Sequence, residues 1–235
     1  RTWLMPVSVW REVEDALEAI IEKYERVNHV ISFFQDERIR REGLEAAQSH
    51  GGVGLEFGSG PGNFTTMLHD RLDGFLVCLD YSTLMLSTAR SWVREEKINF
   101  VRGVFEALPI RPDTLSFAAA AYALRDSRDK VRVMNEVNRA LGKGGRLIIV
   151  DIGKPNNPLF RGLFSLYMRY GVPIIGGLAG GHGFRSPWRL LYETYMLLPT
   201  NEGLLETLKA VFGSAKLEEH VLGGLVVAFA DKESD

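Results

Sequence analysis

The sequence predicts an α/β fold, with a mostly parallel seven-stranded sheet, an antiparallel C-terminal hairpin and helices on both faces. Short apolar runs typical of buried strands alternate with amphipathic helical segments between residues 50 and 155. Each helix returns the chain to the same edge, so successive strands are expected to pair in parallel. Near the C-terminus, two further strand-like runs are separated only by Gly223 and Gly224, which predicts the hairpin.

The composition is that of an ordinary globular chain. Its 235 residues are 46% apolar and 25% charged, which suits one buried core with attachments. A net charge of -2 offers no basic field, so we expect no nucleic-acid partner. The single cysteine, Cys78, excludes a disulfide within one chain, and the histidines and carboxylates show no ligand spacing, so we expect no metal. No signal peptide is visible, and we expect a cytoplasmic protein.

Residues 1–49 are expected to form an N-terminal helical cap. Apolar residues recur at helical spacing from Val9 to Ile31, with charged residues between them, which indicates one or two amphipathic helices. A further helix is expected from Asp36 to Ser49, and Gly51-Gly52 then lead into the first strand.

Residues 50–155 are expected to form a cofactor-binding core. Asp126 or Ser127 is placed to cap its last helix, and the glycines after Leu141 end that helix. Apolar runs predict the strands, and polar-capped amphipathic runs predict the helices. The strands are expected at residues 53–57, 75–79, 98–102, 115–121 and 146–152, and the helices from residue 63, over 83–95 and over 128–141.

After residue 155 the alternation of strands and helices stops. Residues 156–200 are rich in Leu, Phe, Tyr and Gly, with arginines between them, and are expected to form an apolar lid over an acceptor site. The stretch from Leu159 to Leu178 is apolar, but its two arginines and its proline argue against a membrane-spanning helix. Residues 201–235 are expected to complete the core with a helix over 202–212 and strands over 215–222 and 225–230.

A glycine-rich turn follows the first strand in the run L-E-F-G-S-G-P-G, residues 55–62. Its glycines let the backbone approach a ligand, and Asp80, which ends the next strand, is placed to accept hydrogen bonds from ribose hydroxyls. This arrangement indicates a Rossmann-like unit. Asn63 stands where dinucleotide folds have a third glycine, which disfavours NAD or FAD. Glu56 suits the cationic end of S-adenosylmethionine better than a pyrophosphate.

Five segments together resemble class I S-adenosylmethionine-dependent methyltransferases. Their order, with the later V-P-x-x-G and G-L-V-V-A, is similar to the ubiquinone/menaquinone biosynthesis C-methyltransferase family, and the resemblance covers residues 24–229. The segments are E-F-G-S-G-P-G from Glu56, D-Y-S-x-x-M-L from Asp80, G-x-x-E-A-L-P from Gly103, Y-A-L-R-D from Tyr122 and G-G-R-L-I-I-V-D-I-G-K-P from Gly144. The resemblance implies a Rossmann-like class I methyltransferase fold with S-adenosylmethionine as cofactor.

The resemblance also implies a set of cofactor-binding residues. The glycine turn would line the methionine end, Asp80 would hold the ribose, Val104 and Phe105 would border the adenine, and Tyr122 would lie beneath the sulfonium. Tyr24 would help to close the site together with Asn28. The full set is Tyr24, Glu56, Gly58, Ser59, Gly60, Pro61, Asp80, Tyr81, Val104, Phe105, Ala121 and Tyr122.

The chain departs from the family's pattern at several positions. Val104-Phe105 replace a usual polar pair, so adenine recognition would rely on backbone groups and an apolar wall. Ala121 replaces a small hydroxyl residue. Phe34, Asp36 and Ile39 stand where the family has Gly, His and Trp. These differences concern the identity of the substrate more than the class of reaction.

The resemblance implies C-methylation of a quinol precursor in isoprenoid quinone biosynthesis, of the menaquinone or ubiquinone type. This chemistry needs a base for a phenolic proton and a dry pocket. The predicted catalytic residues are Arg125 and Asp126, with Tyr167 and His182 as secondary candidates; alternatively, Asp126 is only a helix cap and Arg125 its salt-bridge neighbour. Aromatic side chains of the insertion are expected to enclose the acceptor ring, namely Phe160, Phe164, Tyr167 and Tyr170.

Other functions stay open at this point. They are O- or N-methylation of another small aromatic or lipid substrate, S-adenosylmethionine binding without catalysis and, less favoured by the glycine spacing, NAD-dependent oxidoreduction. The expected partner is a small hydrophobic quinol-type substrate. The arginines of the insertion also suggest peripheral membrane contact, as a hypothesis, and the sequence does not decide whether the chain forms a homodimer.

Overall fold

The computed structural model describes residues 21, 24–46, 51–71, 73–181 and 187–233. In this part of the chain, no helix combines the length and apolarity needed to cross a membrane.

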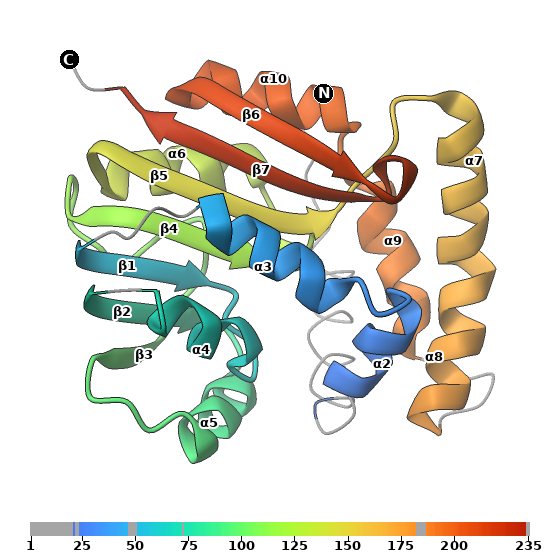
Figure 1. Cartoon of the computed structure of the whole chain (residues 1–235), viewed down its shortest axis with the longest axis horizontal. Helices are drawn as coiled ribbons and strands as arrows, with labels where there is room; N and C mark the ends of the chain where they lie inside the picture. Colours follow the sequence, from blue (N-terminus) through green and yellow to red (C-terminus); the bar gives the residue numbers. More distant parts are fainter. Residues whose placement is uncertain (1–20, 22–23, 47–50, 72, 182–186, 234–235) are drawn as a thin grey trace.

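A seven-stranded sheet runs through the centre of the molecule in the order β3-β2-β1-β4-β5-β7-β6 (Figure 1). Pairing is parallel from β3 to β5, whereas β7 is antiparallel to both β5 and β6. This confirms the predicted sheet and its antiparallel hairpin. The strands are β1 (Gly51–Phe57), β2 (Asp73–Asp80), β3 (Ile98–Arg102), β4 (Leu115–Ala121), β5 (Leu141–Ile152), β6 (Gly213–His220) and β7 (Leu225–Lys232).

Helices cover both faces of the sheet, as predicted. On β5, Leu147 and Ile149 join a core with α6 and α10, while Ile148 and Val150 join the opposite core with α3 and α4. A central strand buried on both faces reads as a continuous apolar run, which explains why this strand was visible in the sequence. The helices of the sheet region are α3 (Asp36–Ala46), α4 (Asn63–His69), α5 (Thr83–Trp92), α6 (Lys130–Ala140) and α10 (Asn201–Phe212).

A third core lies beyond the carboxyl edge of the sheet. Val27 of α2, Met168, Trp188 and Tyr195 pack together there. Figure 1 shows α7 and α8 as one column at the edge of the molecule. The residues just before Pro173 form the π-helical turn η3. Proline has no backbone N–H and so cannot donate the usual helical hydrogen bond, which is consistent with an irregular turn before it. The elements are α2 (Tyr24–Ile31), α7 (Pro158–Leu166), η3 (Tyr167–Gly171), α8 (Val172–Gly180), η4 (Pro187–Arg189) and α9 (Leu190–Met196).

The predicted cap of α6 is wrong. The helix begins at Lys130, and the side chain of Asp129 caps it by accepting the N–H of Arg132 at 3.1 Å. Asp126 instead lies in the 3₁₀ turn η2 (Leu124–Asp126), and the Ser127 hydroxyl donates back to the carbonyl of Leu124 at 2.7 Å. The sequence places acceptors at all three positions, and only the extra turn decides which of them reaches the helix.

Several strand boundaries also differ from the predictions, most clearly those of β5 and β6. Strand β5 begins at Leu141, which pairs with Leu115 of β4, and the next pair is Arg146 with Phe117. The glycine-rich stretch expected to be a turn lies between these two pairs, where the register shifts. Strand β6 begins at Gly213 and ends at His220, and the hairpin turns through η5 (Val221–Gly223).

Replacement of Asp129 by Ala should lower the free energy of unfolding by about 1 kcal/mol, the usual cost of losing a side-chain cap. Chemical denaturation followed by circular dichroism measures this. Asp129→Asn is the matched control because Asn caps helices about equally well. Equal destabilisation by both variants would contradict the assigned cap.

Candidate active site

Two cavities open at the carboxyl edge of the sheet. The first lies over the ends of β1, β2 and β4 and extends to the loop after β3. The second lies between that edge, α2 and the helices of the insertion, residues 156–200. Their volumes are about 130 Å³ and about 270 Å³ respectively.

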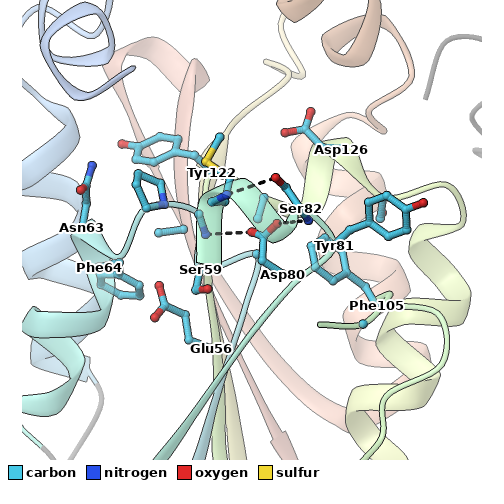
Figure 2. A pocket seen from close by; sticks show the side chains of 18 of the residues that line it. Glu56, Ser59, Asn63, Phe64, Asp80, Tyr81, Ser82, Phe105, Tyr122 and Asp126 are labelled. Carbon is cyan, nitrogen blue, oxygen red and sulfur yellow. Dashed lines mark hydrogen bonds between the residues drawn. The ribbon is translucent and has the colours of Figure 1, made fainter. Parts of the chain in front are cut away.

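Asp80 fixes the glycine turn of the first cavity. The N–H of Gly60 donates to its Oδ2 at 2.8 Å, and the N–H of Ser82 donates to its Oδ1 at 2.9 Å, as the dashed lines of Figure 2 show. Gly58 has a φ of 74°, and a Cβ there would lie 2.2 Å from the Cβ of Ala123. The turn therefore requires glycine for both conformation and space. One carboxylate thus joins the loop after β1 to the loop after β2.

Glu56 lies beside this turn near the end of β1, and Figure 2 shows its carboxylate between Phe64 and Ser59. The side chain lines the first cavity and is only 1% exposed. The hydroxyl of Thr65 donates to its Oε2 at 2.6 Å. Burial, which penalises the charged form, raises the pKa of Glu56 to about 8.

The far wall of the first cavity is largely apolar. Val104 and Phe105 follow β3, and the Phe105 ring meets Phe57 edge to face with centroids 5.5 Å apart. Tyr81 lines the same cavity, and the guanidinium of Arg102 lies 5.1 Å from its ring centroid. This wall suits a flat heteroaromatic group.

Tyr122 lines both cavities and so marks where they adjoin. It follows β4 with a φ of 59°, and its N–H donates to the carbonyl of Val150 at 2.7 Å. The guanidinium of Arg40 lies 5.1 Å from its ring centroid, and its hydroxyl donates to the carbonyl of Asp36 at 3.4 Å. A positive φ is disfavoured for a bulky residue, and strain of this kind is concentrated at functional sites.

The second cavity has mainly apolar walls. They come from α2, α7, η3, α9 and the turn between β6 and β7. The Tyr167 hydroxyl donates to the carbonyl of Ile31, which joins the insertion to α2, and burial raises the pKa of Tyr167 to about 12. Phe160, Phe164 and Tyr167 line this cavity, but the expectation for Tyr170 was wrong: it is 52% exposed and lines neither cavity. Its position places it on the outer face of the helix.

Arg125 and Asp126 lie at different cavities. Arg125 is buried and lines the second cavity, where its N–H and Nη1 donate to the Asp151 carboxylate at 3.2 and 3.3 Å. Asp126 lines the first cavity, with its Oδ1 3.4 Å from Nε of Arg125. Burial raises the pKa of Asp126 to about 6, while the adjacent Arg125 lowers it. Figure 2 shows Asp126 above Tyr81 and Phe105.

Asp36 is a site residue that was not predicted from the sequence. Its carboxylate is buried and lines the second cavity. Oδ1 lies 2.7 Å from Nδ1 of His29 and accepts the Ser32 hydroxyl at 3.0 Å, while Oδ2 accepts Nη1 of Arg40 at 3.3 Å. The available signal was the spacing of these four polar residues, at intervals of three and four, which allows one cluster across a helix boundary.

The first cavity brings together eleven of the twelve predicted cofactor-binding residues. The exception is Tyr24, which starts α2 but whose side chain lies outside the described residues. His182 also lies outside them. Among the residues that the structure describes, no three His, Cys, Asp or Glu side chains gather where they could hold a metal ion.

Curated relatives are similar over most of the chain. A demethylmenaquinone methyltransferase of Lactococcus lactis is 27% identical over 94% of this chain and 89% of its own length. A demethylmenaquinone methyltransferase of Listeria welshimeri is 28% identical over 95% of this chain and 97% of its own length.

Solved structures share the fold. A S-adenosylmethionine-dependent methyltransferase of Thermotoga maritima, described as a possible histamine N-methyltransferase, has a TM-score of 0.68 at 18% identity, covering 94% of this chain and all of its own. A methyltransferase in complex with the Trm112 activator of Haloferax volcanii has a TM-score of 0.64 at 14% identity. The match covers 93% of this chain and 98% of that methyltransferase.

The model of the ubiE/COQ5 methyltransferase family matches residues 6–232. That match spans the sheet, both cavities and the insertion. The chain therefore belongs to the ubiE/COQ5 methyltransferase family and is an S-adenosylmethionine-dependent methyltransferase.

Proposed function

We propose that the enzyme methylates a ring carbon of a hydroquinone with an apolar tail, of the demethylmenaquinol type. The observation that supports this most directly is the large apolar cavity that adjoins the cofactor cavity at Tyr122. Such walls suit a hydrophobic ring and the start of a tail. The printed names of the relatives agree with this substrate class.

We place S-adenosylmethionine in the first cavity, where it would supply an electrophilic methyl group on a sulfonium. Gly58, Ser59, Gly60 and Pro61 would hold its methionine end, and Glu56 would face the positive charge. Asp80 and Tyr81 would contact the ribose, and Val104 and Phe105 would enclose the adenine. Ala121 and Tyr122 would lie near the reacting centre, at the border with the second cavity.

Carbon methylation requires a phenolic proton to leave the acceptor, and we assign its acceptance to Asp36. This carboxylate lines the second cavity, whereas Asp126 lines the first. The proton would pass from the phenolic oxygen to the carboxylate of Asp36, which before the transfer accepts hydrogen bonds from Nδ1–H of His29 and from Nη1 of Arg40. The His29 side chain is 38% exposed and so connects this hydrogen-bonded cluster to solvent.

Arg125 complements this base with a buried positive charge. Its backbone N–H and Nη1 are held by Asp151, so the side chain keeps its orientation at the second cavity. There it would stabilise the phenolate oxygen as the proton leaves. The apolar walls would exclude water, which strengthens this interaction and protects the sulfonium.

The reaction itself is tested with S-adenosylmethionine and a short-tailed demethylmenaquinol, with fragmentation mass spectrometry of the product. We expect the methyl group on the ring carbon. The quinol already methylated at that carbon is the matched control and should give no product. Methyl transfer to oxygen, or binding of S-adenosylmethionine without transfer to this acceptor, would contradict the proposal.

Binding of S-adenosylmethionine should release protons from Glu56. With a pKa of about 8, this carboxyl is mostly protonated at pH 7, and a bound cation favours its charged form. Affinity should therefore rise from pH 6 to pH 8. Calorimetric titration at pH 7 in two buffers of different ionisation enthalpy measures the release. Glu56→Gln is the control; equal buffer dependence in both proteins would exclude Glu56 as the source.

Replacement of Asp36 by Asn should lower kcat about 100-fold, within the range for loss of a general base. The affinity for S-adenosylmethionine should change little, because Asp36 does not line the first cavity. His29→Gln should instead shift the pH dependence of kcat while keeping more activity. Thermal unfolding checks that both variants fold. Wild-type kcat in Asp36→Asn would rule out this assignment.

A further inference from the structure

An apolar stripe runs along the outside of the column formed by α7, η3 and α8. Its side chains follow one another at intervals of three or four residues, so they share one face of the column. They are between 50% and 75% exposed. Figure 1 shows this column at the edge of the molecule. We call these exposed side chains the outer stripe, which consists of Leu159, Leu163, Leu166, Tyr170, Ile174 and Leu178.

The outer stripe reaches the mouth of the second cavity. Leu163 belongs to the stripe and also lines the cavity. Phe33, Val221 and Leu222 line the same cavity and are 61%, 52% and 67% exposed. Together with Leu163 they form an apolar rim. A route into the second cavity is therefore continuous with the exposed apolar surface outside it.

Charge in this part of the chain is one-sided. Residues 152–192 contain no Asp or Glu, although the whole chain has 30 of them. The same segment contains one lysine and four arginines. Of these, Arg169 and Arg189 are exposed, and the Arg169 guanidinium lies 5.3 Å from the ring centroid of Tyr170 in the stripe. Arg189 belongs to η4, which packs against α8.

We propose that the outer stripe and the apolar rim dock on the surface of an anionic lipid bilayer. Exposed leucines beside arginines and a tyrosine match the interface between acyl chains and anionic head groups. A second copy of this chain fits less well, because symmetric pairing of the stripes would gather arginines without carboxylates to oppose them. The proposal that this surface docks on a membrane does not depend on the identity of the methyl acceptor. Entry of the acceptor's apolar tail through the rim does rest on the proposed function.

Vesicle flotation without any acceptor tests the surface. We expect the protein to float with vesicles of phosphatidylglycerol and phosphatidylcholine, and less with phosphatidylcholine alone. The double variant Leu166→Glu/Leu178→Glu should lower the partition coefficient at least tenfold. Both residues are exposed and line neither cavity, so methyl transfer to a short-tailed acceptor should persist. Leu84→Glu on α5, at an exposed apolar position away from the column, is the matched control.

The proposal is overturned if the wild-type protein does not float with anionic vesicles, or if the double variant floats equally well. Light scattering tests the competing occupant, a second copy of this chain. If the wild-type protein is a dimer that does not float, and the double variant is a monomer, the stripe is assigned to a second copy. Flotation lost in the double variant but kept in Leu84→Glu supports the proposal, even if no methyl transfer occurs. Flotation without methyl transfer would reject the proposed acceptor but still support the membrane-docking surface.

Discussion

The left-handed backbone of Tyr122 is the constraint on which the arrangement of both cavities depends. Local sterics oppose this conformation, and the hydrogen bond from its N–H to Val150 on β5 helps to hold it. The turn places the ring against Arg40 and the hydroxyl near the carbonyl of Asp36. One residue at the end of a central strand thus connects the sheet with the N-terminal helices. A flexible junction would not keep two ligands in a fixed relation.

Buried charges are arranged around this junction in two groups. Asp36 is shared by His29, Ser32 and Arg40, and Arg125 lies beside two carboxylates. Burial of an unpaired charge is costly, so each group is stable only as a set. The benefit is orientation: donors and acceptors are already fixed before a reaction begins, which is the main requirement for electrostatic stabilisation of a transition state.

The insertion combines two tasks in one helical column. Its inner side packs around Met168 and Trp188 and supplies walls of the second cavity, while its outer side exposes apolar residues. A surface helix of a soluble protein normally has a polar outer face. An exposed apolar side therefore calls for a partner. The same column therefore forms both a wall of the cavity and the exposed surface beside its entrance.

The sequence by itself determined the sheet, its hairpin and the position of the glycine turn and Asp80 at the first cavity. This was possible because these features are local: strands buried on both faces read as apolar runs, and the glycine turn with Asp80 occupies fixed positions along successive strands. The cap of α6 was missed because three neighbouring polar residues are equivalent in sequence, and only the turn η2 selects Asp129.

Only the tertiary structure decided how the remaining polar residues are used. Adjacent in sequence, Arg125 and Asp126 reach different cavities because a tight turn directs successive side chains apart. Asp36, in α3, acquires its position from contacts with His29 of α2 and with Tyr122, which follows β4. Tyr170 faces outward because of helical phase. Sequence patterns record periodicity within an element, whereas the direction of a side chain relative to another element depends on packing between distant segments.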